Sequence, residues 1–380
     1  MSAKNGLTRS FKLIGCLAVV ALAFSALFAS VASAKKVPPT NKTTYIAMGD
    51  SVSYGYSEEK FDLNYPAEPA SAFSGGLVDI LGEKLAKKEA KLNNLLETKN
   101  LACPGERSVG LIGNGPVAES LIANAEVTHF AAGEAPCAWH NETGFPRHVE
   151  YGTVSQLEAA LGLIAAGKEE GGAPVKDITF QIGSNDELKK LGECASPAYL
   201  SAHGFSSFIE CVQVEAAKTL FPSIINNIGL VVGVLRNAGY TGPIAILGFY
   251  NPQSFLVAGS DPLQKSLNEA MEATIGAGKF GPHVAYGNPF KKTNPQGKKT
   301  ETPEQKQALE KAAICKYTEE CNIFDKKITL EGVVKHPVTG LEVEEEEAKT
   351  GKMISGDIHP THEGHVLFEK TLYSALKKAA

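Results

Sequence analysis

Three common catalytic or metal-binding patterns are missing from the 380 residues of this chain. No Cys-x-x-Cys pair occurs, which removes support for a zinc ribbon or a thioredoxin-like redox site. No His-Glu-x-x-His motif occurs, because His362-Glu363-Gly364-His365 is one residue too short for that zinc-protease pattern. A Gly-x-Ser-x-Gly nucleophile elbow is also absent. No internal repeat or second set of strands is visible, so we expect one domain over residues 35–380.

Residues 1–34 are set apart from this domain by their composition. They open with three basic side chains, continue through an apolar run at Leu13–Phe28 and end in Ala32-Ser33-Ala34. This order is typical of a cleaved signal peptide, so we predict a secreted, extracellular protein. The alternative is an uncleaved anchor, which is less favoured because the apolar run is short for a spanning helix.

Excess positive charge is also lacking. Without residues 1–34, the 37 basic side chains fall to 34 against 42 acidic ones, which leaves a formal charge of −8. A negative surface disfavours a nucleic-acid partner and an anionic membrane surface. We therefore expect no nucleic-acid partner. Independently of the charge, we expect no integral membrane association after signal removal, a monomer, and a small-molecule or lipid substrate.

Six cysteines remain beyond residue 34: Cys103, Cys137, Cys194, Cys211, Cys315 and Cys321. An even number behind a secretion signal indicates disulfides, although free buried thiols are the alternative. Six cysteines allow fifteen pairings. Among these we predict the pairing of sequence neighbours, 103 with 137, 194 with 211, and 315 with 321.

Apolar, β-rich runs alternate with helical patterns from residue 43 onward. Strands are expected at 43–48, 95–102, 177–183, 243–249 and 284–286. Helices are expected at 75–92, 154–166, 205–238 with a break at Pro222, 262–275, 304–317 and 365–378. Such alternation predicts a mostly parallel sheet of about five strands in a three-layer α/β domain with helices on both faces. We interpret the extra length as loop insertions.

The first strand ends abruptly at Gly49-Asp50-Ser51. In an open α/β sheet the carboxyl ends of the strands are where ligands bind, so Ser51 is a candidate nucleophile. Most Gly-Asp-Ser tripeptides are simple turns, and a serine hydroxyl needs a base to activate it.

The candidate base is His359, which lies in Asp357-Ile358-His359-Pro360 just before the last helix. An imidazole base needs an acceptor on its other nitrogen, and Asp357 is the nearest one. The alternative is a surface histidine and an aspartate that caps the helix. His359, His362 and His365 recur every three residues, but Pro360 argues against a shared helix face, so we expect no metal and no cofactor.

Two further strand ends carry possible hydrogen-bond donors for a negative charge. The backbone N–H of Gly105 and the side-chain amide of Asn185 follow the second and third strands. With the N–H of Ser51 they would form a three-donor oxyanion hole. Taken singly, a turn glycine and an Asx turn are the more favoured explanations of Gly105 and Asn185. For Asp50 and Asp186 we expect structural hydrogen bonds.

The four elements together resemble the SGNH/GDSL hydrolase family, whose name letters match Ser51, Gly105, Asn185 and His359. The resemblance runs from about Thr43 to the C-terminus. Asp-Ile-His-Pro-Thr and the Cys315–Cys321 pair also look like the secreted actinobacterial lipase and esterase branch. Members of that branch typically have three disulfides between sequence neighbours, as predicted above.

The resemblance implies a flavodoxin-like fold and a metal-independent serine esterase or lipase that hydrolyses acyl esters through an acyl-enzyme. The family commonly places its aspartate three residues before the histidine, whereas Gly356 stands there in this chain and Asp357 lies two before. A carbohydrate O-acetylesterase would use the same residues, with an aromatic-lined cleft in place of an apolar acyl groove. A non-catalytic cell-envelope binding protein on the same scaffold is the alternative from another class.

Overall fold

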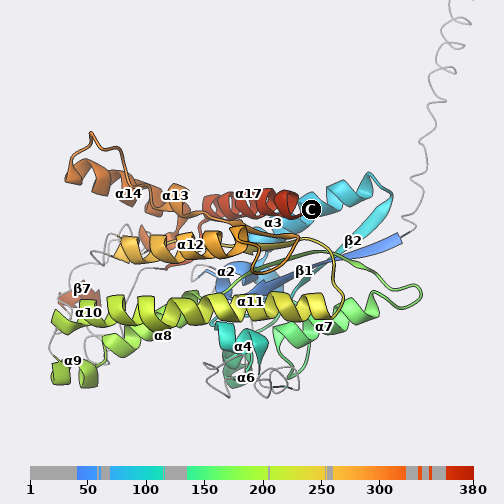
Figure 1. The fold of residues 1–380 in the computed structure, drawn as a ribbon, viewed down its shortest axis with the longest axis horizontal. Coiled ribbons are helices and arrows are strands. Elements are labelled where there is room, and N and C mark those ends of the chain that lie inside the picture. Colours follow the sequence, from blue (N-terminus) through green and yellow to red (C-terminus); the bar gives the residue numbers. More distant parts are fainter. Residues whose placement is uncertain are drawn as a thin grey trace, which may run out of the picture. The chain divides into compact units, whose positions relative to one another are not determined.

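A five-stranded parallel sheet forms the centre of the protein in the computed structural model (Figure 1). The structure describes residues 41–57, 60, 69–113, 115, 135–203, 206–252, 254, 260–321, 333–335, 342–344 and 357–380. These belong to one compact unit, Asn41–Ala380. The predicted signal peptide, 1–34, lies outside the described residues.

The strands lie in the order β2 (Asn94–Asn100), β1 (Asn41–Gly49), β3 (Val175–Gln181), β4 (Ile244–Leu247) and β5 (Val284–Gly287). All four neighbouring pairs are parallel, as predicted. The order 2-1-3-4-5 is that of flavodoxin-like sheets. Connections leave β1 and β3 in opposite directions, and the resulting switch point is where such sheets form a crevice at the carboxyl ends of the strands.

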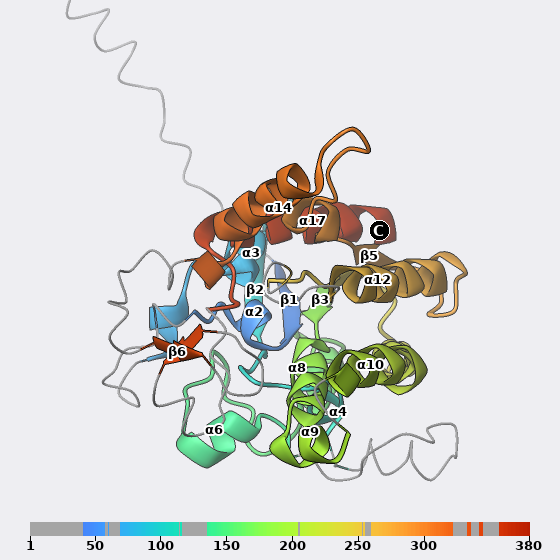
Figure 2. The same ribbon diagram turned by 90° about the vertical axis from the view of Figure 1, so that its left-hand side faces the viewer.

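Helices cover both faces of the sheet, which is why its strands are apolar on both sides (Figure 2). Ile46 and Met48 of β1 pack towards α7 (Gln156–Ala166), α11 (Phe221–Asn237) and α12 (Ser260–Gly276). Tyr45 and Ala47 point to the opposite face. That face packs on α3 (Leu77–Ala90) and α17 (His362–Ala379), whose buried side chains belong to the same cluster. The three-layer prediction is confirmed.

The insertions contain more regular structure than the loops that the sequence indicated. The helix predicted at 304–317 is α14 (Pro303–Tyr317). The other, shorter elements are α2 (Ser51–Tyr54), a 3-10 turn at Ala70–Phe73, α4 (Ser108–Ile112), α6 (Ala138–Thr143), α8 (Ser184–Cys194), α9 (Pro197–His203), α13 (Phe290–Thr293), a 3-10 turn at Glu319–Cys321, and an antiparallel pair, β6 (Val333–Lys335) and β7 (Glu342–Glu344). The helix α8 begins where the sequence indicated only a strand end. An acidic residue in its first turn, Asp186, suits the positive end of a helix dipole.

The helix predicted over 205–238 consists of three pieces. α10 (Ser206–Glu215) leads into a π-helical stretch at Ala216–Leu220, and α11 follows with Pro222 in its first turn. Proline lacks the N–H that an interior helical residue donates, so the hydrogen-bond pattern changes before Pro222. Residues 210–237 are long and apolar enough to cross a membrane by composition. However, the apolar face of α11 lies in the core against the sheet, as in ordinary core helices.

Each of the three disulfides joins sequence neighbours, which is the predicted pairing. Cys103–Cys137 ties the end of β2 to the start of α6, and Cys194–Cys211 ties α8 to α10. Cys315–Cys321 closes the turn after α14.

We expect Gly49→Ala to destabilise the fold by about 3 kcal/mol or more. Gly49 has a φ of +131°, and an added Cβ would lie 2.1 Å from the carbonyl oxygen of Gln181. The matched control is Gly162→Ala on α7, where a Cβ meets nothing within 4 Å. That change should stabilise the helix by up to about 1 kcal/mol. Urea denaturation of both variants checks this, and equal midpoints would contradict it.

Candidate active site

Ser51 lies at the switch point, directly after β1, as the first residue of the short helix α2. Asp50 is the N-cap of this helix, and its Oδ1 accepts the Val52 N–H at 3.0 Å. The structural role predicted for Asp50 is therefore confirmed. The carboxyl is fully buried, and burial raises the pKa of Asp50 to about 7.

The backbone just before Ser51 is held by a residue that sequence reasoning missed, Gln156. Its Oε1 accepts the Gly49 N–H at 2.7 Å, and its Nε2 donates to the Gly49 carbonyl at 2.9 Å. The same Nε2 lies 3.1 Å from Glu106 Oε2. Gln156 is fully buried at the start of α7. The only sequence signal was a polar residue opening an apolar helix, which is also what an exposed residue would give.

Ser51, His359 and Asp357 meet although Ser51 and His359 are 308 positions apart. His359 Nε2 lies 2.8 Å from Ser51 Oγ, and His359 Nδ1 lies 2.5 Å from Asp357 Oδ1. The His359 and Asp357 side chains are 12% and 5% exposed, so water screens their interaction only weakly. Hydroxyl, imidazole and carboxylate thus stand in the order that serine hydrolysis requires.

The two-residue spacing between Asp357 and His359 is sufficient because of a local turn. Asp357 Oδ1 also accepts the backbone N–H of His359, at 3.0 Å. One carboxylate oxygen therefore bonds both the backbone and the ring of the same residue. Such a side-chain-to-backbone bond two residues on is an Asx turn, which fixes the histidine relative to its acid.

The segment before α17 is fastened to the turn after α14. Glu319 donates its N–H to the His359 carbonyl at 2.8 Å, and Thr361 donates to the Tyr317 carbonyl at 3.2 Å. A β-bridge joins Thr318 to Pro360, and Thr318 lies in the loop closed by Cys315–Cys321. The imidazole also meets the ring of Tyr56 edge-on, with centroids 4.6 Å apart. The backbone bonds and the ring contact together fix the position of His359.

The other predicted donors lie at the same sheet edge. Asn185, in the first turn of α8, donates through Nδ2 to the carbonyl of Glu106 at 2.9 Å, and an amide nitrogen carries a second hydrogen. Gly105 is exposed in the turn after β2, with a φ of +75°. Ser51, Asn185 and His359 line one pocket, whereas Gly105 is not among its lining residues.

Asp186 joins the start of α8, which follows β3, to the start of α4, which follows β2. Its two carboxylate oxygens accept the N–H and the hydroxyl of Ser108, each at 2.8 Å. Ser108 Oγ in turn accepts from Asn227 Nδ2 at 2.8 Å. Burial raises the pKa of Asp186 from its ordinary value. The predicted structural role is confirmed, with the partner now identified.

The three histidines near the C-terminus do not form a cluster. His365 is 3% exposed, and its Nδ1 accepts the Leu77 N–H at 3.2 Å. Burial lowers the pKa of His365 to about 3, so it is neutral and structural. Among the described residues, no group of three potential metal ligands occurs.

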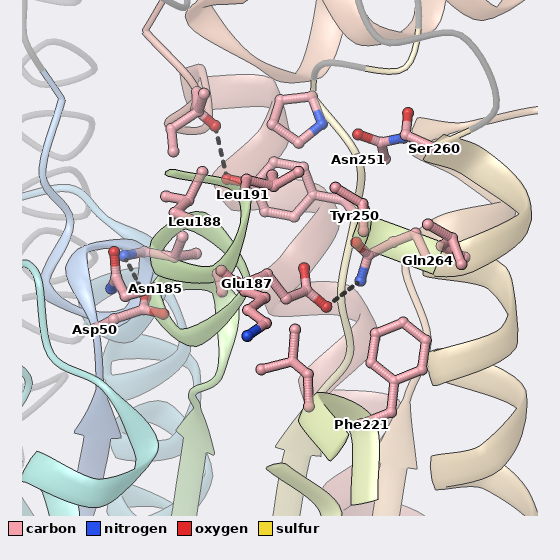
Figure 3. Close-up of a pocket in the computed structure, with 18 of the residues that line it drawn as sticks. Asp50, Asn185, Glu187, Leu188, Leu191, Phe221, Tyr250, Asn251, Ser260 and Gln264 are labelled. Atoms are coloured by element: carbon pink, nitrogen blue, oxygen red, sulfur yellow. Dashed lines mark hydrogen bonds between the residues drawn. The ribbon is translucent and has the colours of Figure 1, made fainter. Parts of the chain in front are cut away.

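A mostly apolar pocket extends from Ser51 between α8, α10, α11 and α12 (Figure 3). Its apolar lining includes Leu188, Leu191, Val212, Leu220, Phe221 and Leu263. Apolar pockets with a few convergent polar groups are the usual form of small-molecule sites. The sequence indicated neither the pocket nor α8, which supplies one wall.

No protein-family model and no curated protein matches this chain. Solved structures do resemble it. The lipase Lip_vut3 from a goat rumen metagenome is 15% identical with a TM-score of 0.36, over 71% of this chain and 94% of the lipase. Phospholipase A1 from Streptomyces albidoflavus NA297 is 14% identical with a TM-score of 0.35, over 89% of this chain and 99% of its own.

A catalytic mutant of the acetylxylan esterase Axe2 from Geobacillus stearothermophilus is 10% identical with a TM-score of 0.37, over 90% of this chain and 96% of its own. Scores of this size carry no inference about activity. The chemistry of the site is therefore inferred from the positions of its own side chains.

The buried carboxyl of Glu106 predicts a pH-dependent stability. Burial raises the pKa of Glu106 from 4.5 to about 7. The unfolded chain releases this proton near the ordinary value and the folded chain only near 7. The free energy of unfolding should therefore fall as pH rises across that window, and the loss should be complete above it. Urea denaturation across this pH range measures the slope.

Glu106→Gln should reduce that slope, because an amide does not titrate in this range. The fold should be kept, since the amide oxygen can still accept the hydrogen bonds from Cys137 N and Gln156 Nε2. Some slope should remain, since Asp50 titrates in a similar range. Glu193→Gln, on the solvent side of α8, is the matched control and should change nothing. An unaltered slope in Glu106→Gln would contradict the assignment.

Proposed function

We propose that this chain is a serine esterase or lipase of the SGNH/GDSL hydrolase type, acting on carboxylic esters. The observation that supports this best is the contact of Ser51 Oγ with His359 Nε2 at 2.8 Å, with Asp357 on the other imidazole nitrogen. This contact stands at the open end of an apolar pocket. Nucleophile, base and binding space thus coincide at the switch point of the sheet.

In the proposed mechanism, Ser51 Oγ attacks the ester carbonyl while His359 Nε2 takes its proton. Asp357 accepts from Nδ1, which selects the tautomer that leaves Nε2 free as a base and stabilises the imidazolium. His359 then returns the proton to the leaving alcohol, and an acyl group stays on Ser51. Water activated by His359 releases the acid.

The negative charge of the tetrahedral intermediate would be met by the N–H groups of Ser51 and Gly105 and by the second amide hydrogen of Asn185. Asn185 is held in place through its bond to the Glu106 carbonyl. Donors that are fixed before the reaction need no reorganisation when the charge develops, which is the source of their catalytic effect.

The pocket favours an acyl chain over a sugar. Aliphatic side chains from α8, α10, the π-helical stretch and α12 make up much of its lining, beside the aromatic Phe208, Phe221 and Tyr250. A lining dominated by aromatic rings would be expected for a glycan. Apolar surface that becomes buried against a hydrocarbon chain contributes about 25 cal/mol per Å². Export from the cytoplasm forms part of the proposal, because three disulfides persist best in an oxidising compartment.

The decisive test compares wild type with Ser51→Ala on p-nitrophenyl esters from acetate to palmitate. We expect hydrolysis by wild type and a loss of at least about 10³-fold in kcat/KM for the variant. A fluorophosphonate probe should label wild type at Ser51. Ser53→Ala is the matched control, because this buried hydroxyl lies two positions away and should leave labelling intact. A protein that neither labels nor hydrolyses would be a binding protein.

Asn185→Ala tests the oxyanion hole. Loss of one such donor costs about 3–4 kcal/mol in the barrier, so kcat should fall by about 10²–10³ with little change in KM. The free energy of unfolding should change far less, because the amide makes one hydrogen bond, to the Glu106 carbonyl. A kcat near the wild-type value would remove Asn185 from the hole.

A further inference from the structure

Two polar side chains interrupt the apolar lining of the pocket. Glu187 comes from α8 and Gln264 from α12, and they meet between the two helices (Figure 3). Gln264 Nε2 donates to Glu187 Oε1 at 3.2 Å. Around them lie Leu188, Leu191 and Phe221. A polar pair in such surroundings is costly unless its hydrogen-bonding groups find partners.

Within the described residues, several hydrogen-bonding atoms of these two side chains have no partner in the protein. Within the described ranges, the Gln264 amide is the only hydrogen-bond partner of the Glu187 carboxyl. Glu187 Oε2, the amide oxygen of Gln264 and its second N–H therefore remain for a ligand. Both residues line the same pocket as Ser51 and Asn185.

The charge state of Glu187 decides what it can bind. Burial raises the pKa of Glu187 to about 8, and the neighbouring Asp186 acts in the same direction. The other titratable groups at the pocket are Lys190, whose Nζ lies 3.1 Å from Glu193, and Asp50 and His359 near Ser51. Near pH 7 the carboxyl is thus mostly protonated and can donate an O–H as well as accept.

We propose that Glu187 and Gln264 determine acyl specificity by binding a hydroxyl or carbonyl oxygen carried on the acyl chain of the substrate. This inference rests on the proposed esterase function. A chain whose ester carbonyl is held at Ser51 and Asn185 enters the pocket that this pair lines. A plain hydrocarbon chain would bury the pair without giving it a partner, so the site should discriminate against it.

The test measures kcat/KM for p-nitrophenyl esters of a medium-length saturated fatty acid and of its monohydroxy derivatives, which are positional isomers of one another. Wild type should hydrolyse at least one isomer about fivefold faster than the plain ester, mainly through a lower KM. Glu187→Leu and Gln264→Leu should each remove this preference and speed up the plain ester relative to the isomers. Glu187→Gln should keep part of the preference, because its amide still donates.

Glu193→Gln is the control on the same helix, since this residue is outside the pocket and its side chain is 51% exposed. It should leave the preference unchanged. If wild type prefers no isomer, or if Glu187→Leu keeps the preference and only lowers the free energy of unfolding, the pair merely links α8 to α12. Absence of any Ser51-dependent hydrolysis would overturn the proposed function as well, so the two failures are distinct.

Discussion

The backbone of one residue at the end of β1, Gly49, fixes the geometry of the whole site. Gly49 has no room for a side chain, and its N–H and carbonyl are both bound by the side chain of Gln156. The same carbonyl accepts from Cys103 after β2, and the next N–H donates to Gln181 of β3. Three strands and α7 are therefore joined around the two peptide groups that flank Gly49, and these groups position Ser51.

The remaining polar residues extend this arrangement from strand to strand. Asn185 holds the carbonyl of Glu106, while Asp186 holds the start of α4 through Ser108. Each bond joins loops that follow different strands, so the donors proposed for the oxyanion are fixed relative to one another. Only His359 arrives from the far end of the chain. Its position depends on the turn after α14 and on the Asx turn with Asp357.

The buried carboxyls around the candidate site lower the free energy of unfolding when they ionise. Burial raises the pKa of Asp50 and Glu106 to about 7 and that of Glu187 to about 8. Carboxyls with such values oppose folding when they ionise, and all three lie at or beside the candidate site. Groups that are unfavourable for the fold but gathered at one place are typical of functional sites, where local rules are broken and compensated elsewhere.

The sequence alone determined the features that depend on near neighbours along the chain. Alternating strands and helices, the Gly49-Asp50-Ser51 strand end, the Asp357-His359 pair and the three cysteine pairs are all local patterns, and the structure bears them out. The four motifs together also predicted that Ser51, Gly105, Asn185 and His359 would meet. Ser51, Asn185 and His359 line one pocket, whereas Gly105 is not among its lining residues.

Tertiary structure alone decided the rest. Gln156 acts on Gly49 from 107 positions away, and Glu187 meets Gln264 across 77 positions. Nothing near either residue in the sequence marks such a contact, because a buried glutamine and an exposed one follow the same helical pattern. The pocket likewise exists only once residues of α8, α10, α11 and α12 come together around it. The residues proposed for catalysis could therefore be predicted from motifs. The residues that position them and line the pocket could be identified only in the folded structure.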